Sequence, residues 1–353
     1  MPTNLLRTSV AFLRRFWFPL GGVAAVAATF WLQQQDSASD LGFVLVCTFN
    51  TVPPPRFPDV LLTFALEPIP MYLLGAAAVW YVRSFSWARG HGYRRQFPGW
   101  RRASFLSGIG LVLLSVFGPA AAYDHTFLTV HMIQHFLLIT IGPPLLLLGA
   151  PFTLLLLRLG AARRRRFLYP VLHSRPFHAL THPAVGVLLF ALIPTLWYVT
   201  PAFEASLTNQ GVHYLGYAVF LFAGIHYWWP LVPANPTRWP MPYPVRLLYV
   251  LALVPIHAFL GLLFYQPETV VYDQLAALPR FWGPSPLMDQ KFAGAFMFVV
   301  GEALGLLALM VIAYQWAAAE EAKGRAYDRQ RARARAGASR PERFSGVPRD
   351  AEP

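Results

Sequence analysis

Residues 127–148 read FLTVHMIQHFLLITIGPPLLLL, and this stretch contains no Asp, Glu, Lys or Arg. A helix that crosses the hydrocarbon core of a bilayer needs roughly 20 predominantly apolar residues. The stretch meets that requirement. Its two histidines, His131 and His135, are four positions apart and therefore share one face of a helix. The stretch predicts a transmembrane helix that carries two imidazoles on the same side.

The composition of the whole chain agrees with a lipid environment. Of its 353 residues, 56% are hydrophobic and only 13% are charged, whereas soluble domains carry about 25% charged residues. The net charge is +13, but the arginines stand in short blocks between apolar runs, which is typical of membrane topology signals. We therefore expect membrane lipid, and no nucleic acid, as a partner. Cys47 is the single cysteine, so a metal site would use His, Met or carboxylate ligands.

The same reasoning predicts about eight membrane spans and an all-α, polytopic transmembrane helix bundle. A cleaved signal peptide is an alternative for the first span, although Trp17 and Trp31 at its ends favour a retained span. Residues 149–158 are too short to span alone, so they either continue the fourth span past a kink at Pro143-Pro144 or lie in the interface. The predicted spans are 16–32, 61–82, 103–122, 127–148, 184–200, 212–232, 246–266 and 289–316.

The orientation of the bundle follows from its connecting segments. Arginine-rich and arginine-poor segments alternate along the chain, and basic segments remain in the cytoplasm. Eight spans with both termini inside satisfy this alternation. We expect residues 1–316 to form the bundle, and 317–353 to begin as a helical extension and end as a basic, disordered cytoplasmic tail. The arginine-rich segments include 83–102, 159–183 and 317–353, and the arginine-poor ones include 33–60, 201–211 and 267–288.

Several polar side chains fall at one depth, in the outer third of the predicted membrane. Ionisable groups inside spans are costly and are commonly functional. Imidazole combined with thioether suits copper, so the sequence predicts a metal site there. Hydrogen bonding across helices is the alternative explanation for each residue taken alone. The predicted ligands are His131, His135, His213, Asp289 and Met297.

Other kinds of site are open to the same residues. The motif HMIQH, residues 131–135, lacks the glutamate of HExxH, so metalloprotease chemistry is not expected. His213 and His226 are separated by 13 residues, which turns them apart by about 220° on a helix. A pair of stacked haems is therefore not expected, but a single-haem redox protein remains an alternative. A metal or solute permease is another, although the polar groups gather near one face and no internal repeat is evident.

Four segments resemble one known family in the same order along the chain. HMIQHFLLITIGPPLLLLGAP at 131–151 is similar to the signature of the bacterial CtaG family of assembly factors for caa- or aa-type cytochrome c oxidase. Residues 181–203 and 213–232 resemble the family's next two spans. PLMDQKFAGAFMFVVGE at 286–302 resembles its DQ-x-x-G-x-x-M element. The resemblance covers roughly residues 125–316.

The resemblance implies a multi-pass protein of the bacterial plasma membrane that is needed to mature haem-copper oxidases, and a role in copper supply is suspected for the family. We therefore expect an assembly factor, not an enzyme, that binds a copper ion and presents it to oxidase subunits. Family members often have a Glu-His pair at the start of the sixth span, whereas in this chain Gly216-Tyr217 stand after His213 at the helical spacing of a second histidine. The positions carried over are His131, Gln134, His135, His213, Asp289, Gln290, Gly294 and Met297.

Overall fold

The computed structural model describes residues 18–29, 31, 54, 56, 65 and 67–338. Their regular secondary structure is helical, apart from an isolated backbone bridge at Ala65. The all-α fold class is thereby confirmed for this part of the chain. The long helices are α2 (Pro68–Gly90), α3 (Gly99–Phe117), α5 (Leu128–Phe136), α11 (Pro183–Val199), α13 (Gln210–Trp228), α14 (Tyr243–Leu251), α15 (Leu253–Tyr265) and α17 (Pro286–Ala338).

Four helical stretches of the described chain are long and apolar enough to cross a membrane. A fifth is obtained if α11 and α12 (Ala202–Thr208), which are bent by 68° to one another, count as one span. The helix Phe18–Thr29 is apolar but shorter. Residues 16, 17, 30 and 32 of the predicted first span, and 61–64 and 66 of the predicted second span, lie outside the described part. The chain is a membrane protein, while eight spans remain a prediction. The four stretches are Gly99–Tyr123, Leu128–Leu148, Tyr243–Tyr265 and Pro286–Arg335.

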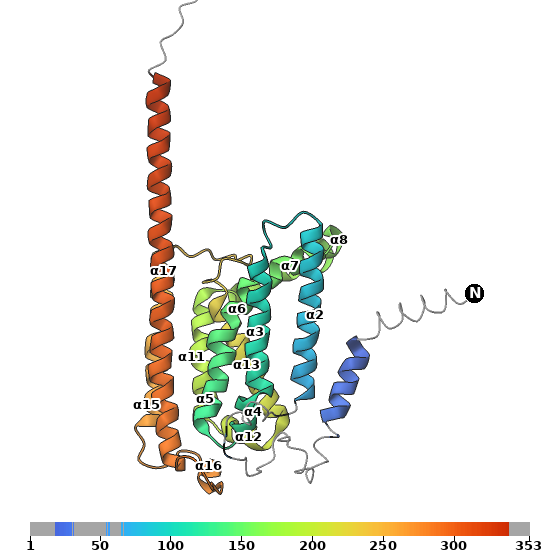
Figure 1. Ribbon diagram of the computed structural model, residues 1–353, viewed down its shortest axis with the longest axis vertical. Helices are drawn as coiled ribbons and strands as arrows, with labels where there is room; N and C mark the ends of the chain where they lie inside the picture. Colours follow the sequence, from blue (N-terminus) through green and yellow to red (C-terminus); the bar gives the residue numbers. More distant parts are fainter. Residues whose placement is uncertain are drawn as a thin grey trace, which may run out of the picture.

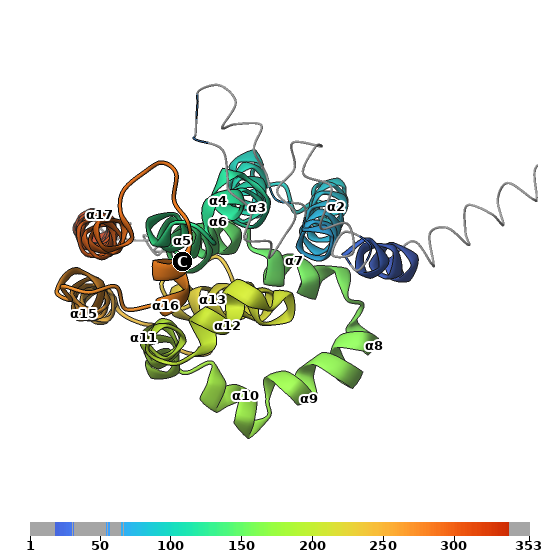
Figure 2. The ribbon, with the colours of Figure 1, turned by 90° about the horizontal axis from the view of Figure 1, so that it is seen from below.

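The long helices run side by side and form a bundle (Figures 1 and 2). α15 packs along α17 at a point where both helices carry glycine. A Cβ atom on Gly261 would lie 2.9 Å from the backbone oxygen of Gly294, so any larger residue would push the two helices apart. Small residues of this kind allow membrane helices to approach closely, and this contact sets how α17 faces the rest of the bundle.

The fourth predicted span is a helix interrupted by one π-helical turn. α5 leads into the π-helical turn η3 (Leu137–Ile141) and then into α6 (Gly142–Leu148). Pro143 and Pro144 lie in the first turn of α6, one residue after η3, and have no backbone N–H to donate. π turns of this type occur frequently at functional sites, and this one begins two residues after His135. Residues 149–158 do not continue the span, because Ala150 adopts a left-handed conformation and α7 (Pro151–Arg158) runs across the bundle (Figure 1).

The two ends of the bundle differ in their residues. One end, which we call the histidine end, holds α4 (Pro119–Tyr123), α12 and α16 (Asp273–Ala277) at the bottom of Figure 1. The opposite end, the arginine end, comprises residues 89–102, 158–182 and 236–246. There α7 and a series of short helical elements form the arc seen in Figure 2. These elements are α8 (Ala161–Arg163), η4 (Arg164–Leu168), α9 (Tyr169–Leu172) and α10 (Arg175–Leu180).

α17 extends far beyond the other helices and ends at Ala338 (Figure 1). Past residue 316 its side chains are mostly exposed. Lys323 pairs with Glu320 at 2.7 Å and Arg325 with Glu321 at 3.1 Å, spacings that stabilise an isolated helix slightly. The predicted helical extension is therefore present. Residues 339–353, predicted to be disordered, lie outside the described part.

Candidate metal site

Two chain segments bring polar side chains together at the histidine end. Asp124 and His125 follow α4 directly and precede α5. His213 lies in the first turn of α13, and Asn209 fixes the start of that helix because its side-chain oxygen accepts a hydrogen bond from the Val212 N–H at 3.1 Å. An Asn at this position satisfies a backbone donor that the helix itself leaves free. The cap therefore sets the position from which His213 reaches the α4–α5 connection.

Asp124, His125 and His213 form what we call the Asp-His cluster. The His125 Nδ1 atom lies 2.8 Å from Asp124 Oδ1, and the His213 Nε2 atom lies 3.4 Å from Asp124 Oδ2. One ligand atom from each of the three residues lies within 4.8 Å of the others. Two of the side chains are almost fully buried, and that of His125 is 14% exposed. The cluster is therefore compact and reaches the surface at His125.

His131 lies beside the cluster and has no hydrogen-bond partner for either ring nitrogen within the described residues. Its ring centroid is 6.3 Å from that of His213 and 4.2 Å from that of His135. The side chain is 1% exposed. Burying a polar group without a partner costs roughly 1–3 kcal/mol by mutational measures, and most buried polar atoms are paired. A buried imidazole nitrogen that no protein group occupies, next to a compact cluster of donor atoms, is available as a metal ligand.

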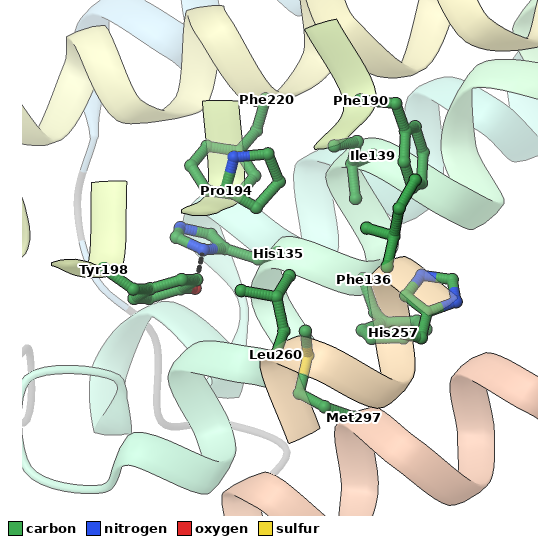
Figure 3. A pocket seen from close by; sticks show the side chains of 11 residues that line it. His135, Phe136, Ile139, Phe190, Pro194, Tyr198, Phe220, His257, Leu260 and Met297 are labelled. Carbon is green, nitrogen blue, oxygen red and sulfur yellow. Dashed lines mark hydrogen bonds between the residues drawn. The ribbon is translucent and has the colours of Figure 1, made fainter. Parts of the chain in front are cut away.

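His135 is differently placed, one turn deeper in α5. Its Nδ1 atom is hydrogen-bonded to the Tyr198 hydroxyl group, and its ring stacks on Phe220 with centroids 3.9 Å apart. It lines a cavity of about 20 Å³, which is roughly the room needed by one water molecule. Met297 and His257 line the same cavity (Figure 3). Met297 is thus placed with His135, and no residue of the Asp-His cluster lines that cavity.

Asp289 makes a different set of contacts. Its carboxylate accepts hydrogen bonds from the backbone N–H groups of Leu128 at 2.7 Å and Thr129 at 3.2 Å. The same carboxylate pairs with Arg280 at 3.3 Å. A carboxylate at a helix N-terminus satisfies free donors and interacts favourably with the helix dipole. Asp289 therefore caps α5 from α17 and holds the histidine-bearing helix in place.

Gln290 joins α17 to α15 and to the loop after it, and Gln134 joins α5 to α3 and α13. Gln290 accepts a hydrogen bond from the Val271 N–H at 2.8 Å and donates to the Phe264 and Thr269 carbonyl groups. Gln134 donates to the Ser115 carbonyl oxygen at 2.9 Å and to the Tyr217 hydroxyl at 3.2 Å. Gln134 and Gln290, two of the positions carried over from the family resemblance, thus hold neighbouring helices together.

The charge of Asp124 is set by its two histidine neighbours. Burial alone would raise the pKa of this carboxyl group, but His125 and His213 outweigh burial and hold the pKa well below its usual value. A carboxylate stabilised by hydrogen bonds and nearby positive charge remains ionised. Asp124 is therefore available as an anionic ligand.

Aromatic and basic residues lie over the α4–α5 connection. The Trp282 ring lies 4.9 Å from the ring of Phe127 and 5.9 Å from that of Tyr123. The Arg280 guanidinium lies 4.9 Å from the Phe127 ring, within the range of cation–π attraction. These contacts hold Arg280 and Trp282, which precede α17, against the residues on either side of Asp124 and His125.

The sequence-based prediction missed Asp124 and His125 as site residues. A usable signal exists, because Asp124 is the single acidic residue between positions 68 and 203 and His125 follows it immediately. Both stand directly before the helix of His131. The sequence places both in the short connection between the predicted spans 103–122 and 127–148, and only the fold shows that this connection packs against His213 of α13.

A buried cluster of imidazole and carboxylate groups inside a membrane helix bundle defines a membrane protein with a candidate metal site. The family comparison is more specific. The chain belongs to the cytochrome c oxidase caa3 assembly factor family (Caa3_CtaG), whose family model matches residues 79–319. The predicted resemblance is thereby confirmed, and the matched region contains the whole Asp-His cluster as well as His131.

Similar proteins are found in mycobacteria. Uncharacterized protein Mb0105 of Mycobacterium bovis and Uncharacterized protein MT0111 of Mycobacterium tuberculosis are each 29% identical over 275 residues, which is 75% of this chain and 41% of theirs. Uncharacterized protein ML1998 of Mycobacterium leprae is 29% identical over 256 residues, which is 69% of this chain and 38% of its own. The chain thus spans about two-fifths of the length of these curated relatives. No solved structure matches it.

Proposed function

We propose that this protein is a non-catalytic membrane factor that binds copper at its histidine end and presents it to subunits of a haem-copper cytochrome c oxidase during assembly. The family supports the association with oxidase assembly. The observation that carries the copper proposal is the convergence of Asp124, His125 and His213 beside the unpartnered His131.

The distances in the cluster fit a single ion after small side-chain adjustments. Metal–nitrogen and metal–oxygen bonds of about 2.0–2.2 Å place two ligand atoms at most about 4.4 Å apart. The ligand atoms of the cluster already lie within 4.8 Å of one another. In this proposal Asp124, His125 and His213 bind the ion and His131 supplies a further imidazole. Of the ligands predicted from sequence, His135 and Met297 lie one turn deeper, and Asp289 positions α5.

The proposal includes a topology. Eight spans with both termini in the cytoplasm would place the arginine end inside and the histidine end outside the plasma membrane. The charge distribution supports this arrangement, because arginines are concentrated at one end and residues 125–203 contain no acidic residue. Basic segments are retained in the cytoplasm. The copper site would then open toward the side on which it can meet externally exposed parts of an oxidase.

A deletion strain grown at limiting copper tests the role. We expect less assembled haem-copper oxidase, with unchanged transcripts for its subunits, and restoration by the full chain. Normal oxidase activity in the deletion strain would contradict the proposal. The purified protein should contain copper and lack the visible absorption of haem. Haem absorption in stoichiometric amount would favour the single-haem alternative, for which the described residues offer no specific support.

A further inference from the structure

The cavity beside His135 is bordered by donor side chains from three helices. Its lining includes His135 of α5, His257 of α15 and Met297 of α17 (Figure 3). Its volume of about 20 Å³ is roughly that needed by one water molecule, so a single metal ion of similar size would also fit. Of the described residues that line it, none is Asp, Glu, Lys or Arg. The cavity is therefore a small space without acidic groups, bordered by two imidazoles and a thioether.

His257 is buried among apolar groups. Its side chain is 2% exposed, and its Nδ1 atom has no hydrogen-bond partner within the described residues. The ring centroid lies 5.2 Å from that of Phe136 and 5.9 Å from that of Phe190. A Cβ atom on Gly301 of α17 would lie 2.6 Å from the His257 Cγ atom, so the glycine leaves room for the imidazole ring. Most buried polar atoms are paired, and an ion in the adjacent cavity would give this imidazole a partner.

His135 is held in place through one of its two ring nitrogens. Its Nδ1 atom is hydrogen-bonded to the Tyr198 hydroxyl group. The carbonyl oxygen of Tyr198 in turn accepts a hydrogen bond from the Tyr272 hydroxyl at 2.8 Å. Metal-bound histidines use one ring nitrogen for the ion and the other for a hydrogen bond that fixes the ring. The Nε2 atom of His135 is therefore the nitrogen that is left for an ion.

The donor types distinguish this cavity from the Asp-His cluster. Imidazole and thioether are uncharged ligands, and thioether sulfur selects monovalent copper. The cost of placing an ion in an apolar interior rises with its charge, and the cavity offers no carboxylate to offset a second charge. The cluster includes Asp124 and no sulfur atom, and its nitrogen and oxygen donors suit divalent copper. The two places therefore suit different classes of ion.

We propose that the cavity lined by His135, His257 and Met297 is a second metal site, which binds one monovalent copper ion. The ligands are the Nε2 atom of His135, an imidazole nitrogen of His257 and the sulfur atom of Met297. Tyr198 is a positioning residue that holds the His135 ring. The proposal extends the proposed function, because the protein then holds copper at two places, but it is independent of the Asp-His cluster.

The full chain, purified in detergent with Cys47→Ser to remove its single thiol, provides the test. Cu⁺ is kept reduced under anaerobic conditions and titrated in competition with a chromophoric chelator. Met297→Leu and His257→Leu should each lower the Cu⁺ affinity by about 100-fold, and Tyr198→Phe by roughly 10-fold. X-ray absorption at the copper edge should show a sulfur neighbour in the parent protein and none in Met297→Leu.

Two controls separate this site from its surroundings. Met132→Leu is the matched substitution, because Met132 is a fully buried methionine of α5 that does not line the cavity. It should keep both the Cu⁺ affinity and the sulfur signal. His213→Ala removes an imidazole of the Asp-His cluster and should likewise leave the sulfur-bound Cu⁺ in place.

Unchanged Cu⁺ affinity in folded Met297→Leu or His257→Leu protein would overturn the proposal. So would a parent protein that binds no Cu⁺ or binds it without a sulfur neighbour, which is the result expected if the cavity holds only a water molecule. If neither leucine variant folds, Tyr198→Phe, which removes only a hydroxyl group, decides by its loss of affinity or the lack of one. Cu²⁺ binding at the Asp-His cluster is measured separately, so these results leave the proposed function standing.

Discussion

Glu67 and the Asp-His cluster at the histidine end are buried or nearly so, whereas most of the arginines at the arginine end are exposed and dispersed. Glu67, Asp124 and His213 are each at most 2% exposed. At the other end the Arg158 guanidinium lies over the Trp87 ring at 4.9 Å, and that of Arg166 lies over the Phe167 ring at 5.3 Å. These two arginines are exposed, and an exposed charge contributes little to stability by itself.

The difference between the ends shows which polar residues point to a specific ligand. Exposed arginines are solvated without any partner, so their number matters more than their positions. Buried imidazoles and carboxylates need partners, and both ring nitrogens of His131 are among the buried polar atoms that have no hydrogen-bond partner within the described residues. Substitutions at the histidine end should therefore act through particular atoms, and those at the arginine end through total charge.

The largest effect is expected for His213→Ala. It removes one imidazole of the cluster, so Cu²⁺ affinity should fall by about 100-fold or more and assembled oxidase should fall with it. Equilibrium dialysis and oxidase activity of complemented cells measure the two effects. His226→Ala is the control on the same helix, since His226 lies toward the arginine end and bonds to the Phe222 carbonyl oxygen. Equal losses of Cu²⁺ affinity in both variants would show that copper binding does not depend on the Asp-His cluster.

The orientation of the two ends gives an all-or-none labelling result. In a Cys47→Ser background, Thr208→Cys at the histidine end should react in intact cells with a thiol reagent that does not cross the membrane. Arg164→Cys at the arginine end should react only after the cells are opened, because basic segments stay in the cytoplasm. Labelling of both positions from the same side would reject the proposed topology, and with it the external position of the copper site.

A loss of stability is expected for Asp289→Ala. The change removes the cap of α5 and leaves the buried Arg280 without its partner, which should cost about 3 kcal/mol. Thermal unfolding in detergent measures the loss, and copper binding should weaken because α5 carries His131. Asp273→Ala is the matched control at an exposed aspartate and should have little effect. If Asp289→Ala keeps its stability and loses only copper, Asp289 is a ligand, as predicted from the sequence.

The smallest effect is expected at the arginine end. Replacing Arg164, Arg165 and Arg166 by glutamine should change the stability by less than about 0.5 kcal/mol for each residue, as is usual for surface positions. Copper affinity should be unchanged. The same measurements on purified protein test this, and a loss of copper affinity comparable to that of His213→Ala would erase the distinction between the two ends.

Most of the helices could be predicted because their signals are local. The predicted span 127–148 corresponds to Leu128–Leu148 and the predicted span 184–200 to α11 (Pro183–Val199). Apolar length fixes where a membrane helix lies, since its backbone must satisfy its own hydrogen bonds in lipid. The shared helix face of His131 and His135 could also be predicted from the sequence, because helical periodicity places residues four apart on one face.

The sequence by itself determined the helical class, the membrane environment and the common face of His131 and His135. Only the tertiary structure decided that Asp289 would cap α5, that Met297 would join the cavity of His135, and that Asp124 would meet His213. The physical reason is the rotation of each helix about its own axis. Packing contacts between distant segments set that rotation, such as the approach of Gly261 to Gly294. The position of a residue along its own helix fixes its depth in the membrane, whereas the direction of its side chain depends on all the helices around it.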